Sequence, residues 1–308
     1  MTTRVYTHDD FAGHVTPPGH SEQVARLDAV NRALAHIPLD RHDAPVAEDA
    51  EILRCHPAAY LAKVRRAVPA EGFTALDGDT ILCPGSLTAA LRAVGGIAAA
   101  VDAVMTGKAN NAFIAARPPG HHAETATAMG FCLFGTVAIA AKRLLDHHGL
   151  SRVAIVDFDV HHGNGTQDLL WDEPRILFAS THQMPLYPGT GSAQERGAHG
   201  QILNHPLRAG TGSSAMRAAY ENHILPALDA YAPQVLLISA GFDAHEADPL
   251  ASLDWQTEDY AWLTRRLCDI ADRHAHGRIV STLEGGYDLP ALQASVAAHV
   301  GVLEERGR

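Results

Sequence analysis

The chain has 308 residues and a net charge of −11, and 46% of its residues are hydrophobic. That hydrophobic fraction excludes a mainly disordered chain, and an acidic balance without a run of Lys or Arg argues against nucleic-acid binding. The four cysteines are far apart, which disfavours a disulfide framework or a Cys-ligated zinc, and no segment has the pattern of a signal peptide or membrane span, so a soluble cytoplasmic protein is expected.

In chain order, the apolar pattern predicts an α/β protein whose mainly parallel central sheet is covered by helices on both faces. The first hundred residues are expected to supply an edge strand at 4–7 and covering helices, one of which begins after Ser86. Further on, short and almost continuously apolar runs alternate with amphipathic helical patterns, as strands buried on both faces do. The runs span residues 111–117, 152–160, 176–181, 235–243 and 278–283, and the helical patterns span 133–145, 216–228 and 260–270. Residues 183–213 are rich in turn formers and are expected to form a long surface loop, and residues 1–308 are expected to form a single domain.

Ionisable side chains follow four of the predicted strands. His121 and His122 come after the first run, residues 157–164 lie at the end of the second, Asp243 ends the fourth, and Tyr287 follows the fifth. Ligands of parallel sheets bind beyond the carboxyl ends of the strands. One concave site carrying carboxylates, imidazoles and a phenol is therefore expected at that edge.

The segment Asp157-Phe158-Asp159-Val160-His161 predicts a metal site, because its alternate residues point to one face of an extended chain. Asp159 and His161 are expected to be ligands, with Asp243 as the third, which leaves an open position for water or substrate. If Asp157 and Asp159 only capped turns, the site would hold uncompensated negative charge, so that alternative is disfavoured. Zinc (Zn2+) is the first choice, with Fe2+ or Mn2+ as alternatives.

The tandem histidines His121 and His122 can divide general-base and general-acid work beside such a metal. Each imidazole needs an orienting partner, and Asp157 and Asn164 are the candidates. Tyr287 follows two glycines, and its hydroxyl is placed to donate to a developing oxyanion; the alternative is a buried tyrosine that packs beneath the loop.

Six ordered motifs resemble the zinc-dependent histone deacetylase family, which includes bacterial deacetylase-like amidohydrolases and acetylpolyamine amidohydrolases. The resemblance runs from about Gly19 to the C-terminus, and Asn164-Gly-Thr-Gln is similar to the class II branch. The motifs are RPPGHHA (117–123), GFCLF (130–134), DFDVHHGNGTQ (157–167), YPGTG (187–191), SAGFDAHEADPL (239–250) and LEGGYDL (283–289).

The resemblance implies a three-layer arginase/deacetylase-like fold and an enzyme that removes acetyl or related acyl groups from lysine-like amines, in a peptide or a small molecule. It implies that Asp159, His161 and Asp243 bind zinc and that Tyr287 polarises the acyl carbonyl. The implied catalytic set is His121, His122, Tyr287, Asp157 and Asn164; the substrate-binding set is Gly130, Phe131, Tyr187 and Leu250; and a structural potassium (K+) site comprises Asp157, Asp159, His161, Ser180 and Thr181.

Three departures from the family pattern accompany the resemblance, whereas Leu250 after Asp248-Pro249 is similar to ordinary lysine deacylases. Ser21 replaces a proline, Gly135-Thr136 stand where the family usually has Asn, and Tyr187 replaces a more usual Phe. Leu250 occupies a position where an acidic residue would favour a cationic polyamine, which weakens the hypothesis of an acetylpolyamine substrate.

Three alternative functions stay open at this stage. The first is an acetylpolyamine or other small-molecule amide deacetylase of the same family. The second is an arginase-like ureohydrolase, which would need further aspartates for a second metal where this chain has His162-Gly163. The third is a non-catalytic acyl-lysine-binding module, against which the intact Tyr287 and tandem histidines argue. The sequence does not define the oligomeric state.

Overall fold

The computed structural model describes residues 3–308 and is built on an eight-stranded sheet in which every neighbouring pair is parallel. The strand order is β2-β1-β5-β10-β9-β6-β7-β8. These strands are β1 (Arg4–Thr7), β2 (Asp40–Asp43), β5 (Asn111–Ile114), β6 (Val153–Asp157), β7 (Ile176–Gln183), β8 (Ile202–Leu207), β9 (Val235–Ala240) and β10 (Ile279–Leu283). A separate antiparallel pair joins β3 (Thr74–Ala75) to β4 (Ile81–Leu82).

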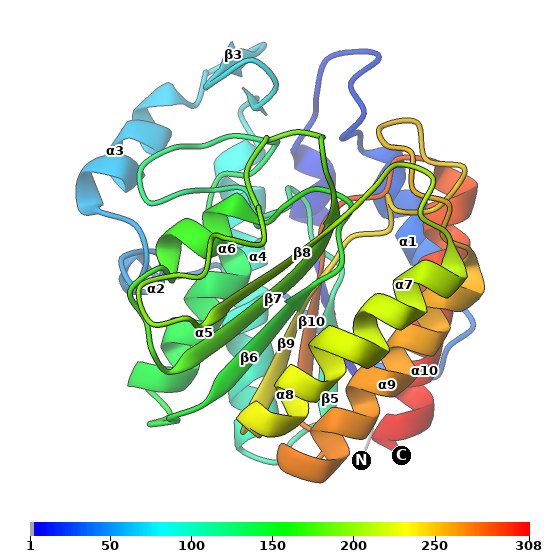
Figure 1. Ribbon diagram of the computed structural model, residues 1–308. Coiled ribbons are helices and arrows are strands. Elements are labelled where there is room, and N and C mark those ends of the chain that lie inside the picture. The colour runs from blue at the N-terminus through cyan, green and yellow to red at the C-terminus, as the bar shows by residue number, and fades with distance from the viewer. Residues whose placement is uncertain (1–2) are drawn as a thin grey trace.

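Helices cover both faces of the sheet and make three layers, which confirms the predicted fold class (Figure 1). One side carries α1 (Ala25–Leu34), α7 (Ser213–Ala219), α8 (Leu225–Tyr231), α9 (Thr257–His274) and α10 (Leu289–Gly307), with the π-turn η2 (Tyr220–Ile224) between α7 and α8. The other side carries α4 (Ser86–Met105) and α5 (Thr136–Asp146). The remaining helices are η1 (Asp9–Gly13), α2 (Asp49–Ile52), α3 (Ala58–Ala67) and α6 (Asn164–Leu169).

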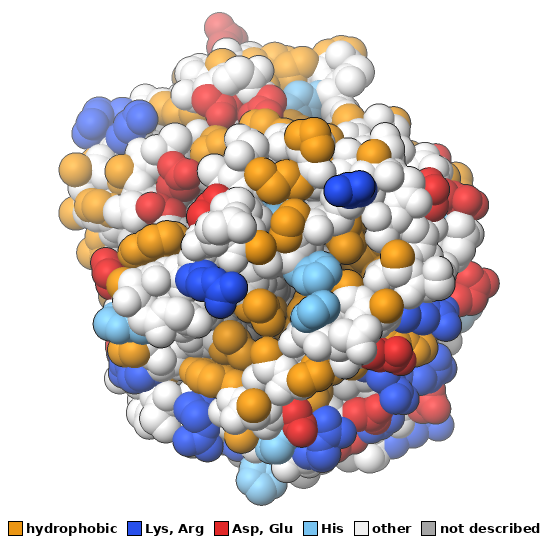
Figure 2. Space-filling view, viewed as in Figure 1, with side chains coloured by type: hydrophobic (Ala, Val, Ile, Leu, Met, Phe, Trp, Pro, Cys, Tyr) orange, Lys and Arg blue, Asp and Glu red, His pale blue; other side chains and the backbone are white. Residues whose placement is uncertain are grey.

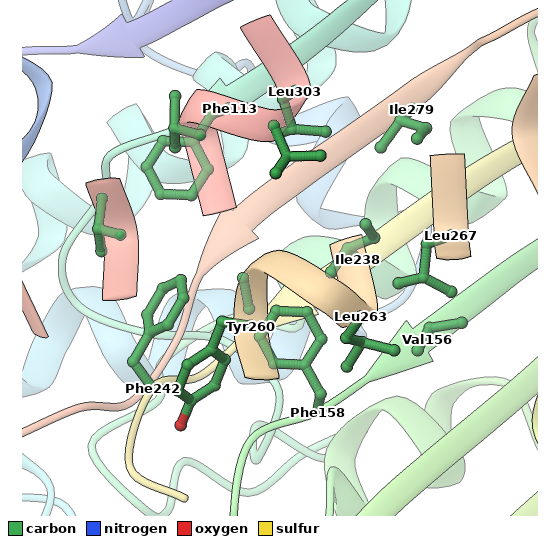
Figure 3. Packing of buried hydrophobic residues seen from close by; sticks show 14 of the residues in the cluster. Phe113, Val156, Phe158, Ile238, Phe242, Tyr260, Leu263, Leu267, Ile279 and Leu303 are labelled. Atoms are coloured by element: carbon green, nitrogen blue, oxygen red, sulfur yellow. The ribbon is translucent and has the colours of Figure 1, made fainter. Parts of the chain in front are cut away.

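Alternate residues of the central strands enter different cores. In β6, Ala154 and Val156 pack in the cluster that includes α9 and α10, whereas Val153 and Ile155 pack in the cluster that includes α4 and α5. Since both faces are covered, both sets must be apolar, and the strand has the continuous apolar sequence noted above. Figure 3 shows the first core, where Phe158, Phe242 and Tyr260 meet below the carboxyl ends of the strands.

Helix α4 is long and apolar enough, by length and composition, to cross a membrane. Its most apolar 18-residue window has a mean hydropathy of 1.5, and 67% of that window is buried inside this fold. Buried positions include Ala93, Ile97 and Val101, which pack in the core shared with α5 and the sheet. The structure thus explains the hydropathy of α4 by burial in a protein core.

The structure corrects three expectations about the sheet. Residues 4–7 do form a strand, but β1 is not at the edge, because β2 pairs outside it. Residues 183–213 are not only loop, since they contain β8, which pairs with β7 and forms the opposite edge. The strands predicted at 152–160 and 235–243 end at Asp157 and Ala240, because the chain leaves the sheet there to build the site.

Candidate active site

The predicted strand ends do meet, because β5, β10, β9 and β6 are neighbours in the sheet. They surround a cavity of about 280 Å³. Its lining contains the predicted His122, Gly130, Phe131, His161, Tyr187, Leu250 and Tyr287, together with Asp79 and Leu186, which were not predicted. The predicted substrate-binding residues thus form its walls, and the predicted chemical groups lie at or below its floor.

His161 lines the cavity, and Asp159 and Asp243 lie beside its Nδ1. His161 Nδ1 lies 3.1 Å from Asp159 Oδ1 and 3.1 Å from Asp243 Oδ2, and one ligand atom from each residue lies within 4.8 Å of the others. The backbone also holds both carboxylates: Gly285 N–H donates to Asp159 at 2.8 Å, and Val160 N–H donates to Asp243 at 2.9 Å. The three donor atoms are therefore preorganised.

This donor set fits a divalent cation. A Cβ at Gly241 would lie 2.1 Å from Asp159 Oδ2, and a Cβ at Gly285 would lie 2.1 Å from Asp243 Oδ2, so glycines leave room for the carboxylates. Burial disfavours the charged ring of His161, but Asp159 and Asp243 outweigh burial and raise its pKa to about 10. The two buried carboxylates therefore favour positive charge at this point, and a metal ion bound by two carboxylates and one imidazole would supply it.

Within residues 3–308 one further group of potential metal ligands is present, Asp102 with His147 and His148. Both oxygens of Asp102 already accept hydrogen bonds from Arg143, at 3.0 and 2.8 Å. The guanidinium of Arg143 neutralises the carboxylate of Asp102. This group therefore attracts a metal cation much less than the group of Asp159, His161 and Asp243 does.

The tandem histidines have the two predicted partners. His121 Nδ1 lies 3.0 Å from Asp157 Oδ2, and His122 Nδ1 lies 2.7 Å from Asn164 Oδ1. Burial opposes charge on both rings, but Asp159 and Asp157 raise the pKa of His121 well above its usual value. Burial and the neighbouring imidazoles His121 and His161 lower the pKa of His122. The surroundings therefore favour the proton on His121 and disfavour it on His122.

Tyr287 borders the cavity beside Phe131, with the ring centroids 5.9 Å apart. Burial raises the pKa of its phenol well above 10, so the hydroxyl keeps its proton and can donate it in a hydrogen bond. Its backbone is fixed, because Tyr287 N–H donates to Asp248 at 2.7 Å and Arg26 donates to the Gly286 carbonyl at 2.7 Å.

A buried charge network supports the tyrosine loop, residues 284–287, through Arg26. The sequence did not predict this network as a unit. Arg117 forms a two-pronged ion pair with Glu22, at 2.6 and 2.7 Å, and Arg26 approaches the same carboxylate at 3.0 Å. All three side chains are fully buried. The i, i+4 spacing of Glu22 and Arg26 is a sequence signal for their ion pair. No such spacing points to Arg117, which lies 95 residues away from Glu22.

Glu284 is a second buried carboxylate whose role the sequence did not reveal. It accepts hydrogen bonds from the backbone N–H groups of Gly120 at 2.7 Å and His121 at 3.1 Å. Burial raises its pKa to about 7. Because Glu284 also begins the segment that carries Tyr287, it ties the tyrosine loop to the tandem histidines.

The remaining predicted residues lie just below the cavity. Asp157 faces Ser180 across the β6–β7 pairing, and Thr181 follows it. The two hydroxyls have side-chain partners, since Ser180 Oγ lies 2.9 Å from His182 Nδ1 and Thr181 Oγ1 lies 2.8 Å from the Tyr220 hydroxyl. The structure thus places Asp157 beside Ser180, two of the five residues expected at the potassium site.

The Gly135-Thr136 departure fits its surroundings. Gly135 N–H donates to His56 at 2.9 Å, and a Cβ at position 135 would lie 2.3 Å from Leu169 Cδ1. Thr136 is buried at the first position of α5. The small residue therefore lets α6 approach this turn closely.

Comparisons with known proteins give one consistent result. Residues 20–303 match the model of the histone deacetylase domain. The histone deacetylase-like amidohydrolase of Pseudomonas aeruginosa is 39% identical, over 90% of this chain and 73% of that protein, and a probable deacetylase of Archaeoglobus fulgidus is 37% identical, over 94% and 82%. The crystal structure of the HDA15 HD domain superimposes with a TM-score of 0.92 at 32% identity, covering 98% of this chain and 90% of that one.

Proposed function

The chain belongs to the histone deacetylase family, and from this premise we propose that it is a zinc-dependent amidohydrolase that removes acetyl or related acyl groups from lysine-like amines. Deacetylase or amidohydrolase activity follows from the family. The zinc and the substrate class are the parts that we add.

One observation carries the proposal. Two carboxylates converge on the imidazole of His161, which lines a cavity that also presents His122 and Tyr287. A divalent cation held there supplies Lewis-acid chemistry, which polarises an acyl oxygen and acidifies water. An amide carbonyl that reaches the floor would meet an acceptor of protons on one side and a phenol donor on the other.

The protein side chains divide the remaining work. Neutral His122 accepts a proton from the attacking water, and the tandem histidines return a proton to the departing amine. Cationic His121, held by Asp157, keeps positive charge next to this transfer. Tyr287 donates a hydrogen bond to the oxyanion that forms on the acyl carbon.

The residues that line the cavity favour a substrate with a long, largely apolar side chain that ends in an amide. Phe131, Tyr187, Leu186 and Leu250 all line it. We therefore place an acylated lysine, in a peptide or as a small molecule, ahead of an acetylated polyamine. Leu250 is the discriminating position, because it places no carboxylate there for a second amine, and Asp79 is the one carboxylate among the lining residues that the structure describes.

The substrate assignment is tested by measuring free acetate from an acetyl-lysine peptide and from an acetylated polyamine at equal concentrations. We expect the peptide to be the better substrate, and Leu250→Glu to shift the ratio of kcat/KM toward the polyamine by about tenfold, the effect of a gain near 1.4 kcal/mol. A wild-type protein that prefers the polyamine would overturn the assignment to lysine.

The metal assignment is tested by elemental analysis of purified protein. Asp159→Ala should lose the stoichiometric zinc of the wild type, because it removes one of three ligands. The matched control is Asp102→Ala, in the surface group with His147 and His148, which should leave zinc at wild-type stoichiometry. Full zinc in Asp159→Ala would exclude that residue as a ligand.

We also propose that a K+ ion binds beside Asp157, Asp159, His161, Ser180 and Thr181. The complete burial of Asp157 supports a nearby cation in addition to His121. A higher midpoint of thermal unfolding in KCl than in choline chloride at equal ionic strength is the expected result, and equal midpoints would count against the site.

A further inference from the structure

Asn164 is an amide with two distinct ends, and its surroundings differ at each end. Its Oδ1 lies 2.7 Å from His122 Nδ1. Its Nδ2 donates to Glu124 Oε1 at 2.8 Å and approaches Met129 Sδ at 3.3 Å. A carboxylate and a thioether can only accept hydrogen bonds, so they hold the NH2 group on their side.

The orientation of this amide decides which ring nitrogen of His122 carries hydrogen. Because the carbonyl oxygen of Asn164 can only accept, Nδ1 of His122 must donate, and the neutral ring then has its lone pair on Nε2. His122 lines the cavity, so that lone pair is available to take a proton from water. If the amide were reversed, its NH2 group would donate to Nδ1, and Nε2 would carry the hydrogen.

His121 needs no further residue to fix the orientation of its hydrogen-bond partner. Its Nδ1 faces the Asp157 carboxylate, which accepts whatever its rotation. The amide of Asn164 can present either an oxygen or an NH2 group to His122, so another residue has to fix its orientation. Glu124 is the charged acceptor that contacts the NH2 group, and it therefore fixes this orientation most strongly.

The segment that carries Glu124 is fixed relative to Asn164. Thr125 donates to Asp168 of α6 through its N–H at 2.8 Å and through its hydroxyl at 2.6 Å. Glu124 N–H donates to the Thr127 carbonyl at 3.0 Å, which closes a turn. Because Asn164 is the first residue of α6, the carboxylate and the amide are held on one local frame.

We propose that Glu124 is a positioning residue: by accepting from Asn164, it orients the amide so that His122 presents an unprotonated Nε2 to the substrate cavity. Glu124 acts through Asn164 and does not touch the reacting atoms. The inference rests on the proposed amide hydrolysis for its effect on rate, whereas the hydrogen-bond polarity itself does not depend on any activity.

The test compares three variants. Glu124→Gln keeps an accepting oxygen, and Met129 still favours the same amide orientation, so kcat should stay within about threefold of the wild type. Glu124→Lys presents only donors and reverses the amide, so kcat should fall by about 100-fold, the loss of a general base, with KM and bound zinc unchanged. Glu124→Lys combined with Asn164→Asp should recover much of that loss, because a carboxylate at 164 accepts from His122 in either rotation.

Three results would overturn the proposal. The first is a wild-type kcat in Glu124→Lys. The second is an equal loss of kcat in Glu124→Gln and Glu124→Lys, which would indicate an effect of charge. The third is a change in Glu124→Lys that is confined to KM.

A spectroscopic readout separates this proposal from the proposed function. In protein labelled with 15N-histidine, the ring signals of His122 are assigned by their loss in His122→Asn. We expect the Nδ1–H tautomer in the wild type and the Nε2–H tautomer in Glu124→Lys. The same tautomer in both proteins would refute the role of Glu124, whether or not the wild type releases acetate. Absent acetate release with a tautomer change would instead count against the hydrolase assignment alone.

Discussion

His121, His122 and His161 are chemically identical side chains that have three different partners at Nδ1. His161 faces two carboxylates, His121 faces one carboxylate, and His122 faces an amide oxygen. In the proposed mechanism, these partners make His161 a metal ligand, favour the proton on His121 and leave His122 as the base.

At the scale of single residues, the spacing of residues and their places at strand ends were enough to predict that the three histidines gather at one site. They also predicted that Asp157 and Asn164 contact the tandem histidines. Glu124 could not be predicted to orient Asn164. It lies in a loop 40 positions away in sequence, and its effect depends on the rotation of one amide.

The phenol of Tyr287 gives the first prediction at this scale. Tyr287→Phe should lower kcat by about 100- to 1000-fold, the usual effect of removing one oxyanion donor, because only the hydroxyl is lost. The ring still fills its place beside Phe131, so zinc content and the thermal midpoint should match the wild type. Steady-state kinetics with an acetyl-lysine peptide provide the measurement, and undiminished turnover would remove Tyr287 from the mechanism.

At the scale of elements, the long-range contacts were the part that sequence patterns did not reveal. The strand β2 has the sequence DRHD, which is polar throughout and resembles a loop, and its pairing with β1 becomes evident only in the fold. The strand β8 contains Pro206 within a turn-rich segment, as an edge strand tolerates. By contrast, β6 and β9 are buried on both faces, and their continuous apolar sequences made them predictable.

The junction between the N-terminal segment and the tyrosine loop depends on Glu22. Glu22→Gln should lower the free energy of unfolding by about 3 to 5 kcal/mol, because Arg26 and Arg117 would be left buried with one carboxylate fewer. Urea denaturation measures the change. The control is Asp229→Asn in the exposed pair with Arg273, which should change stability by less than about 1 kcal/mol. A small effect at Glu22 would show that the network is not needed for stability.

The contact between α9, α10 and β10 predicts a pH effect. His299 bridges Thr264 at 2.7 Å and Ser281 at 2.9 Å, and burial lowers its pKa to about 3. In the unfolded chain its pKa is about 6.5, so the unfolded state takes up the proton first as pH falls. The stabilisation from neutral His299 is therefore complete above about pH 6.5 and is lost progressively as pH falls toward 3.

His299→Gln should accordingly flatten the acid side of the stability curve. Between pH 7 and pH 5 we expect the wild type to lose about 2 kcal/mol more than the variant, at about 1.4 kcal/mol for each unit of pKa difference. Chemical denaturation across this pH range measures the slopes, with His36→Gln at an exposed position as the control. Parallel curves for wild type and His299→Gln would contradict the assignment of a neutral buried ring.

At the scale of the whole molecule, the parallel sheet itself creates the site. Four neighbouring strands deliver their following loops to one edge of the sheet, and the cavity lies among those loops. Figure 2 shows, on one face of the molecule, acidic, basic and hydrophobic side chains intermixed, with no single sign of charge dominating that face. The three-layer fold was predictable because its signals are local and repeated along the chain. The shape of the cavity was not, since Asp79 and Leu186 reach it from irregular segments.

The most direct test of the account measures acetate release from an acetyl-lysine peptide as a function of zinc bound per chain. Chelation should abolish release, and titration with Zn2+ should restore it in proportion, reaching a plateau at one ion per chain. Full hydrolysis by metal-free protein, or a plateau that requires two ions per chain, would contradict the mechanism built on Asp159, His161 and Asp243.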